Sequence, residues 1–133
     1  MPIQKQRKGK SMQKIHGTNL GNWLVLEKWM MPDLFEPYGA EDETWLTRKV
    51  PVQELAAMMK AHRDTYVTEE DFRYLADQGL NTLRLPVPYF VFGDRPPFIG
   101  CIEYVDRAMD WAEQYGLRVL LDLHTVPYSQ NGY

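Results

Sequence analysis

The stretch Leu117-Arg-Val-Leu-Leu-Asp-Leu-His124 indicates the fold of this chain. Its apolar run is typical of a strand buried on both faces of a parallel sheet, and polar residues follow where such strands release their loops. We therefore predict a strand over residues 118–123. The polar segment over residues 122–133, which includes Asp122-Leu-His124 and Ser129-Gln-Asn-Gly132, is the expected functional loop.

Two further units of the same kind precede this strand. Apolar residues at helical spacing predict a helix over residues 102–115, closed by Gly116. Thr68 and the acids after it predict a second helix, which ends at Gly79 and leads into an apolar strand over residues 80–86. A third helix is expected over residues 52–61, after a first short strand that begins near residue 15. This order of strand, helix, strand, helix, strand is that of an α/β protein.

Two architectures are built from this repeat, the doubly wound sheet and the eight-stranded barrel. The glycine-rich strand-to-helix turn that holds a dinucleotide is missing, because Gly17 and Gly21 are followed by Trp23 and a loop. We therefore expect an α/β fold, a (β/α)8 TIM barrel of which this chain holds the first three β/α units. Polar residues fall where the site of such a barrel collects, at the expected carboxyl ends of strands: Asn19, Arg84 and His124.

Composition limits the classes of partner. The 133 residues are 44% hydrophobic and 25% charged, which suits one globular domain. A net charge of −3 argues against a nucleic-acid surface, although basic residues gather in a leader over residues 1–14, which we expect to be mobile, before the domain at 15–133. Neither a secretory signal nor a membrane span is recognisable, so a cytoplasmic location is expected.

Redox and metal chemistry find no support in the sequence. The single cysteine, Cys101, cannot form a disulfide within the chain, and no His/Cys cluster has the spacing of metal ligands. We expect no cofactor and no metal.

The long connection over residues 27–49 is too aromatic for disorder, and ordered loops of this length usually cover or line a site.

Five motifs together resemble the opening third of exo-β-1,3-glucanases and β-glucosidases of glycoside hydrolase family 5. Their order and spacing carry the resemblance, which spans residues 15–133. The motifs are Gly17-Thr-Asn-Leu-Gly-Asn-Trp-Leu-Val-Leu-Glu27, Thr68-Glu-Glu-Asp-Phe72, Gly79-Leu-Asn-Thr-Leu-Arg-Leu-Pro86, Asp122-Leu-His124 and Ser129-Gln-Asn-Gly132.

The resemblance implies hydrolysis of O-glycosidic bonds at a terminal glucose, with retention of configuration and with β-glucan or β-glucoside as the substrate. Retention needs two carboxyl groups about 5–5.5 Å apart, which the family supplies after its fourth and seventh strands. No acidic residue of this chain matches either one. Glu69 and Glu70 are better explained as the acidic first turn of a helix.

Supporting residues are carried over one by one. Arg84 resembles the family arginine whose charge keeps the nucleophile ionised, although any surface arginine can pair with an acid. His124 resembles the histidine that borders the subsite of the cleaved sugar, the alternative being a structural role. The remaining matches would bind substrate: Glu27 and Trp29 at the terminal glucose, and Asn131 and Tyr133 in the loop at the pocket mouth.

The chain departs from the family pattern in ways that bear on specificity. Thr125, Val126 and Tyr128 replace small residues, and Pro88 replaces a glycine. A β-glucosidase acting on short glucosides or diglycosides therefore remains an alternative to a glucanase. Two readings without activity also stay open, a non-catalytic carbohydrate-binding remnant and a truncated reading frame.

Overall fold

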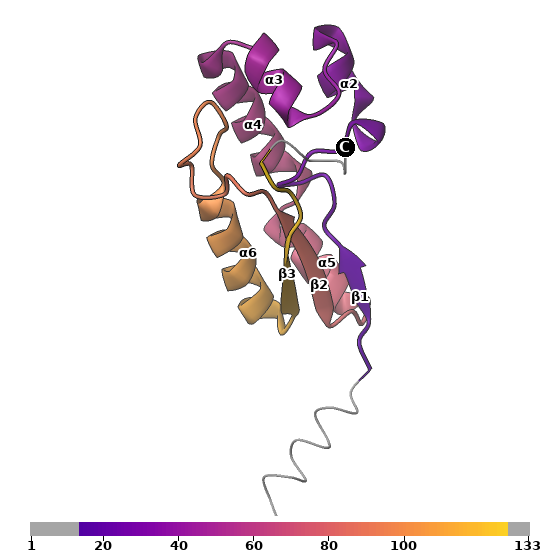
Figure 1. Cartoon of the computed structure of the whole chain (residues 1–133). Coiled ribbons are helices and arrows are strands. Elements are labelled where there is room, and N and C mark those ends of the chain that lie inside the picture. Colours follow the sequence, from indigo (N-terminus) through magenta and orange to yellow (C-terminus); the bar gives the residue numbers. More distant parts are fainter. Residues whose placement is uncertain (1–13, 128–133) are drawn as a thin grey trace, which may run out of the picture.

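Three parallel strands form the sheet of the computed structural model, which describes residues 14–127 (Figure 1). They lie in the order β1 (Gly17–Asn19), β2 (Thr82–Val87) and β3 (Arg118–Leu123), so that β2 is central. The longer helices are α4 (Val52–Tyr66), α5 (Glu69–Asp77) and α6 (Ile102–Tyr115). No helix within the described residues is long and apolar enough to cross a membrane.

The best-predicted elements are those with a strong apolar period and a glycine stop. Helix α6 and strand β3 have the predicted bounds, and Gly116 ends α6 in the left-handed region at φ 70°. Helix α5 begins with a capping box in which Thr68 and Asp71 each bond the other's backbone. Helix α4 is longer than predicted because it continues to Tyr66, and β2 is shifted by one or two residues.

The connection over residues 27–49 is more helical than expected. It contains η1 (Lys28–Met30), α2 (Pro32–Phe35), η2 (Glu36–Tyr38) and α3 (Glu43–Lys49). Helix α3 begins where the Asp42 side chain accepts a hydrogen bond from the backbone N–H of Trp45 at 3.1 Å. These four pieces lie above the carboxyl ends of the strands, beside α4 (Figure 1).

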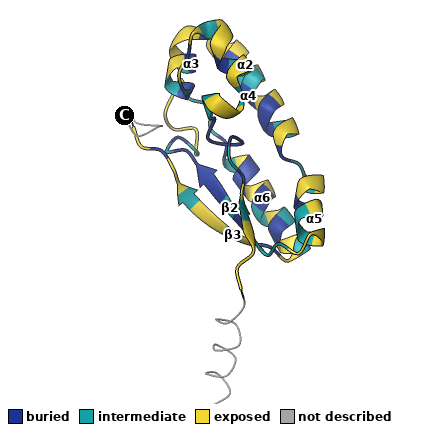
Figure 2. Ribbon diagram, turned by 90° about the vertical axis from the view of Figure 1, so that its right-hand side faces the viewer, coloured by how far each residue is buried: buried dark blue, intermediate teal, exposed yellow. Residues whose placement is uncertain are grey.

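The two faces of the sheet differ in character. Leu83 and Leu85 of β2 are fully buried on the face covered by α5 and α6, where Phe72 and Ala108 join the same core. Since side chains alternate along a strand, Arg84 lies on the opposite face. Figure 2 shows the helices on one side of the sheet and exposed residues along β3, the strand at its edge. The fold is thus a parallel α/β arrangement with one covered and one open face.

Strand β3 carries apolar side chains that the described residues do not cover. Leu120, Leu121 and Leu123 are 59%, 49% and 65% exposed, although a strand of this composition is normally buried on both faces. Only β2 pairs with β3 within residues 14–127, so β3 is an edge strand of the described sheet.

We expect the 133-residue chain, purified alone, to self-associate through β3, because exposed apolar edges template further pairing. Leu123→Lys should reduce association by placing a charge on that edge. Tyr74→Lys, at a position on α5 that is 61% exposed, adds the same charge elsewhere and should not. Sedimentation velocity checks this, and a wild-type monomer with a sharp cooperative melt would contradict it.

Candidate functional site

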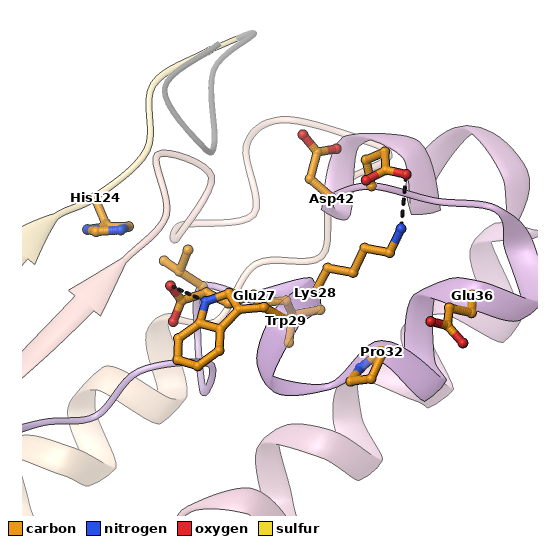
Figure 3. A pocket seen from close by; sticks show the side chains of 10 residues that line it. Glu27, Lys28, Trp29, Pro32, Glu36, Asp42 and His124 are labelled. Atoms are coloured by element: carbon orange, nitrogen blue, oxygen red, sulfur yellow. Dashed lines mark hydrogen bonds and ion pairs between the residues drawn. The ribbon is translucent and has the colours of Figure 1, made fainter.

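A cavity of about 740 Å³ opens between the connection that follows β1 and the end of β3 (Figure 3). The segment after β1 supplies one wall, residues from α2 to the N-cap of α3 supply the far side, and a single residue comes from the loop that follows β3. Its lining residues are Val25, Leu26, Glu27, Lys28, Trp29, Pro32, Glu36, Glu41, Asp42 and His124. Three residues predicted to bind substrate, Glu27, Trp29 and His124, therefore line one cavity.

Glu27 and Trp29 lie side by side in this cavity. The Trp29 indole N–H donates to Glu27 Oε1 at 3.4 Å, and the Trp29 side chain is 77% exposed. Gly21 lies against the same carboxylate: a Cβ added there would be 3.2 Å from Glu27 Oε2 and 3.1 Å from Asn19 Nδ2. The glycine thus allows the Glu27 carboxylate and the Asn19 amide to approach the backbone closely.

The backbone at Glu27 is fixed by Asn22. Among the described residues, Asn22 is the one non-glycine residue with positive φ, at 63°, a region that asparagine tolerates better than most residues. Its Oδ1 accepts a hydrogen bond from the Glu27 N–H at 2.7 Å, and the residue is 1% exposed. Asn22, a buried residue in the left-handed region, therefore positions the backbone of Glu27 at the cavity.

Two adjacent buried residues of α4 hold the loops that follow β1 and β2. His62 Nε2 lies 2.7 Å from the carbonyl oxygen of Asn22 and 3.0 Å from that of Trp23, and the Trp23 indole N–H donates to the Arg63 carbonyl at 2.9 Å. Arg63 donates to the carbonyl oxygens of Ile99 and Gly100, both at 2.8 Å. Burial lowers the pKa of His62, so the ring is neutral and Nε2, which faces two acceptors, carries its proton.

A buried acid lies beside this pair. Glu43, in the first turn of α3, is 1% exposed, and burial raises its pKa to about 7 although the charge of Arg63 opposes the shift. The neighbouring Asp42 lines the cavity. Because Glu43 follows Asp42 at the start of α3, its protonation near neutral pH affects the helix end that forms one wall of the cavity.

A row of polar side chains crosses the open face of the sheet. Arg84 donates through Nη1 to Asn19 Oδ1 at 3.2 Å and through Nη2 to Asp122 Oδ2 at 2.6 Å. His124 Nδ1 lies 2.8 Å from that same Asp122 oxygen. The prediction that Arg84 ends its strand is wrong, because Arg84 is the third residue of β2 and is opposite Asn19 at the end of the shorter β1.

Asp122 is the site residue that sequence reasoning missed. The alternation of strand side chains offered a signal, because Asp122 and His124 are two residues apart and so share a face. The register adds that Asp122 is opposite Pro86, two residues after Arg84. Neither the partner nor the shared oxygen could be deduced from one strand.

The other predicted residues fall in two groups. Glu69 and Glu70 occupy the first turn of α5, where Glu69 accepts from the Tyr115 hydroxyl at 3.1 Å, in agreement with their structural assignment. Asn131 and Tyr133 lie outside the described residues. Within residues 14–127 no group of three or more His, Cys, Asp or Glu side chains could hold a metal.

Burial raises the pKa of the Cys101 thiol to about 12. The thiol is therefore protonated at neutral pH and unsuited to act as a nucleophile.

One departure from the family pattern has a structural role. Thr125 is 2% exposed, and its hydroxyl accepts a hydrogen bond from the Tyr89 N–H at 3.1 Å, which joins the loops after β3 and β2. Pro88 is fully buried in the same region, and Val126 is exposed. Two of the replacing residues, Thr125 and Pro88, are thus packed in the loops that follow β3 and β2.

Comparisons with known proteins agree with the geometry. Over 126 residues the chain is 44% identical to a probable glucan 1,3-beta-glucosidase A of Emericella nidulans, with 91% of this chain and 31% of that protein covered. It is 42% identical over 129 residues to glucan 1,3-beta-glucosidase 1 of Schizosaccharomyces pombe, with 91% and 32% covered. The chain thus spans about a third of these relatives, their N-terminal portion. No protein-family model matches it.

Two solved structures have folds similar to that of this chain. A rutinosidase from Aspergillus niger superposes with a TM-score of 0.79 at 28% identity and covers 91% of this chain and 36% of its own. A second structure, AoRut, gives a TM-score of 0.78 at 30% identity, with 88% and 34% covered. The resemblance to the exo-β-1,3-glucanases and β-glucosidases is therefore confirmed for the N-terminal portion of such proteins.

We expect Glu43→Gln to remove a pH dependence of stability. Glu43 binds its proton more tightly when folded, at a pKa of about 7 against an ordinary value of 4.5, so its ionisation costs stability as pH rises from about 4.5 to 7. At pH 8 the glutamine variant should be more stable than wild type, by up to about 3 kcal/mol.

Urea unfolding of both proteins across pH 4–8, each carrying Leu123→Lys to limit association, measures the difference. Glu54→Gln is the control, because Glu54 is an exposed acid of α4 that accepts a hydrogen bond from the Tyr38 hydroxyl. The stability difference between this variant and wild type should not change with pH in the same way. A constant difference between Glu43→Gln and wild type across this range would contradict the prediction.

Proposed function

We propose that this chain, similar over 91% of its length to glucan 1,3-beta-glucosidases, forms the part of a retaining β-glucosidase or exo-β-1,3-glucanase that receives the terminal glucose. The whole protein would be a (β/α)8 barrel. The observation that carries the proposal is the cavity that Glu27 and Trp29 share with His124 from another loop. The catalytic glutamates would lie beyond the segment that matches this chain.

The chemistry of the cavity suits an uncharged sugar. The Glu27 carboxylate can accept hydrogen bonds from sugar hydroxyls, and the exposed Trp29 indole offers an apolar face to a pyranose ring. Lys28, the one lysine or arginine among the residues that line the cavity, pairs with Glu41 at 2.9 Å. Glu27, Glu36 and Asp42 remain as additional acids, which would repel an anionic sugar such as a glucuronide.

The position of Arg84 supports its expected part in the complete protein. Its guanidinium is held on the open face of the sheet by Asn19 and Asp122. In a closed barrel that face would be the interior, where a cation beside the nucleophile would keep a carboxylate ionised.

A second candidate is a β-glucosidase that acts on diglycosides. The structural similarity to a rutinosidase and the packed Thr125 and Pro88 beside His124 favour it. A non-catalytic carbohydrate-binding role would use the same cavity without the two glutamates, and a truncated reading frame would use neither.

We expect methyl β-glucoside to quench the fluorescence of Trp29 in a saturable way. Glu27→Ala should weaken binding by about ten- to a hundredfold, since hydrogen bonds to charged groups contribute roughly 1.5–3 kcal/mol. Glu70→Gln, on α5 outside the cavity, is the control. Unsaturable quenching, or equal effects from both substitutions, would contradict the proposed pocket.

The 133-residue chain itself should release no glucose from aryl β-glucosides above the uncatalysed background, because retention needs two placed carboxyl groups. Turnover by the purified chain, abolished by Glu27→Gln, would show that the site has been misplaced.

In the protein made from the complete reading frame, Arg84→Ala should lower kcat, on the order of a hundredfold as for other removed electrostatic groups. The acidic limb of its pH profile should move to higher pH, because a carboxylate without its cation ionises less readily. Arg73→Ala, an exposed arginine on α5, is the matched control. An unchanged kcat and pH profile would restrict Arg84 to a structural role.

A further inference from the structure

One carboxylate oxygen in the polar row serves two functional side chains. Asp122 Oδ2 accepts from Arg84 Nη2 at 2.6 Å and lies 2.8 Å from His124 Nδ1. The three side chains are partly exposed, at 41% for Arg84, 27% for Asp122 and 35% for His124. Asp122 therefore belongs to the open face and not to the core.

The contact with Asp122 determines which nitrogen of His124 carries the proton. An ionised carboxylate only accepts, so the Nδ1 that faces it must donate. When the ring is neutral, Nε2 then bears a lone pair. His124 lines the cavity, and a lone pair there can accept a hydrogen bond from a sugar hydroxyl.

We propose that Asp122 is a positioning residue, which holds neutral His124 in its Nδ1–H form while it holds Arg84 across the sheet. Asp122 itself does not line the cavity, so it acts through these two side chains. The part of this inference that concerns sugar rests on the proposed function. The tautomer of His124 and the contact between Asp122 and Arg84 do not rest on the proposed function.

His62 provides an internal contrast for the test. Its Nε2 faces the carbonyl oxygens of Asn22 and Trp23, at 2.7 and 3.0 Å, and its Nδ1 is buried without a hydrogen-bond partner. His62 is therefore an Nε2–H histidine, the opposite tautomer to the one inferred for His124. It is a buried residue of α4 and has no contact with the polar row among its hydrogen bonds, so it reports on whether a variant has folded.

The experiment is ¹⁵N solid-state NMR of the full chain labelled at histidine, at about pH 9, where unperturbed histidines are neutral. This method tolerates an associated protein. In wild type we expect a protonated Nδ1 for His124 and a protonated Nε2 for His62, assigned by loss of signal in His124→Gln. The opposite tautomer for wild-type His124 would overturn the proposal without any further variant.

Asp122→Ala removes the acceptor, so His124 should shift mainly to the Nε2–H form that imidazole prefers in water, while His62 stays unchanged. Asp122→Asn keeps an acceptor oxygen without the charge and should give an intermediate mixture. Asn19→Ala removes the other partner of Arg84 and should leave His124 in the Nδ1–H form. Retention of that form in a folded Asp122→Ala chain would overturn the proposal.

Glucose added to the same samples separates the two hypotheses. A shift of the His124 Nε2 resonance, absent for His62 and lost in Asp122→Ala, supports both the positioning role and the pocket. The inferred tautomers without any glucose-dependent shift would support the positioning role and count against the proposed pocket.

Discussion

The register of β2 between its two neighbours is the constraint on which the site depends. Pairing of Asn19 with Arg84, and of Pro86 with Asp122, brings polar side chains from three strands onto the same face. Leu83 and Leu85, fully buried under the helices, hold this register, because a slip of one residue would exchange the two faces of the strand. The hydrophobic face therefore selects the position of the polar one.

Above the sheet, a second constraint comes from α4. The adjacent residues His62 and Arg63 bind carbonyl groups in the loops after β1 and β2, and both side chains are buried. Burying polar groups is costly unless they are bonded, so these contacts favour one arrangement of the loops over others. Asn22 connects this network to Glu27, because its Oδ1 accepts a hydrogen bond from the Glu27 N–H. The rigidity of the cavity wall thus originates in a helix that contributes nothing to its lining.

Elements defined by local interactions were predicted more accurately than elements that depend on tertiary packing. Helix α6 and strand β3 were predicted to the residue because a local apolar period and a local glycine cap define them. Grouping of Glu27 with His124 in one cavity agreed with what the family motifs implied, whereas the roles assigned to them stay predictions. Arg84 was misplaced within β2, and the short helices over residues 28–49 were missed, because strand lengths and one-turn helices depend on tertiary packing.

The shared oxygen of Asp122 has a consequence for how the site responds to change. Arg84 and His124 do not touch each other in any described contact, yet each competes for and polarises the same carboxylate. Loss of one donor leaves the carboxylate free to bind the other more closely, so the effects of substituting Arg84 and His124 should not add. If Arg84 supports the nucleophile and His124 contacts the sugar, then support of the chemistry and recognition of the substrate are coupled through a residue that performs neither task directly. Such coupling is available only because Asp122 near the end of β3 and His124 just after it are two residues apart on the face that Arg84 occupies.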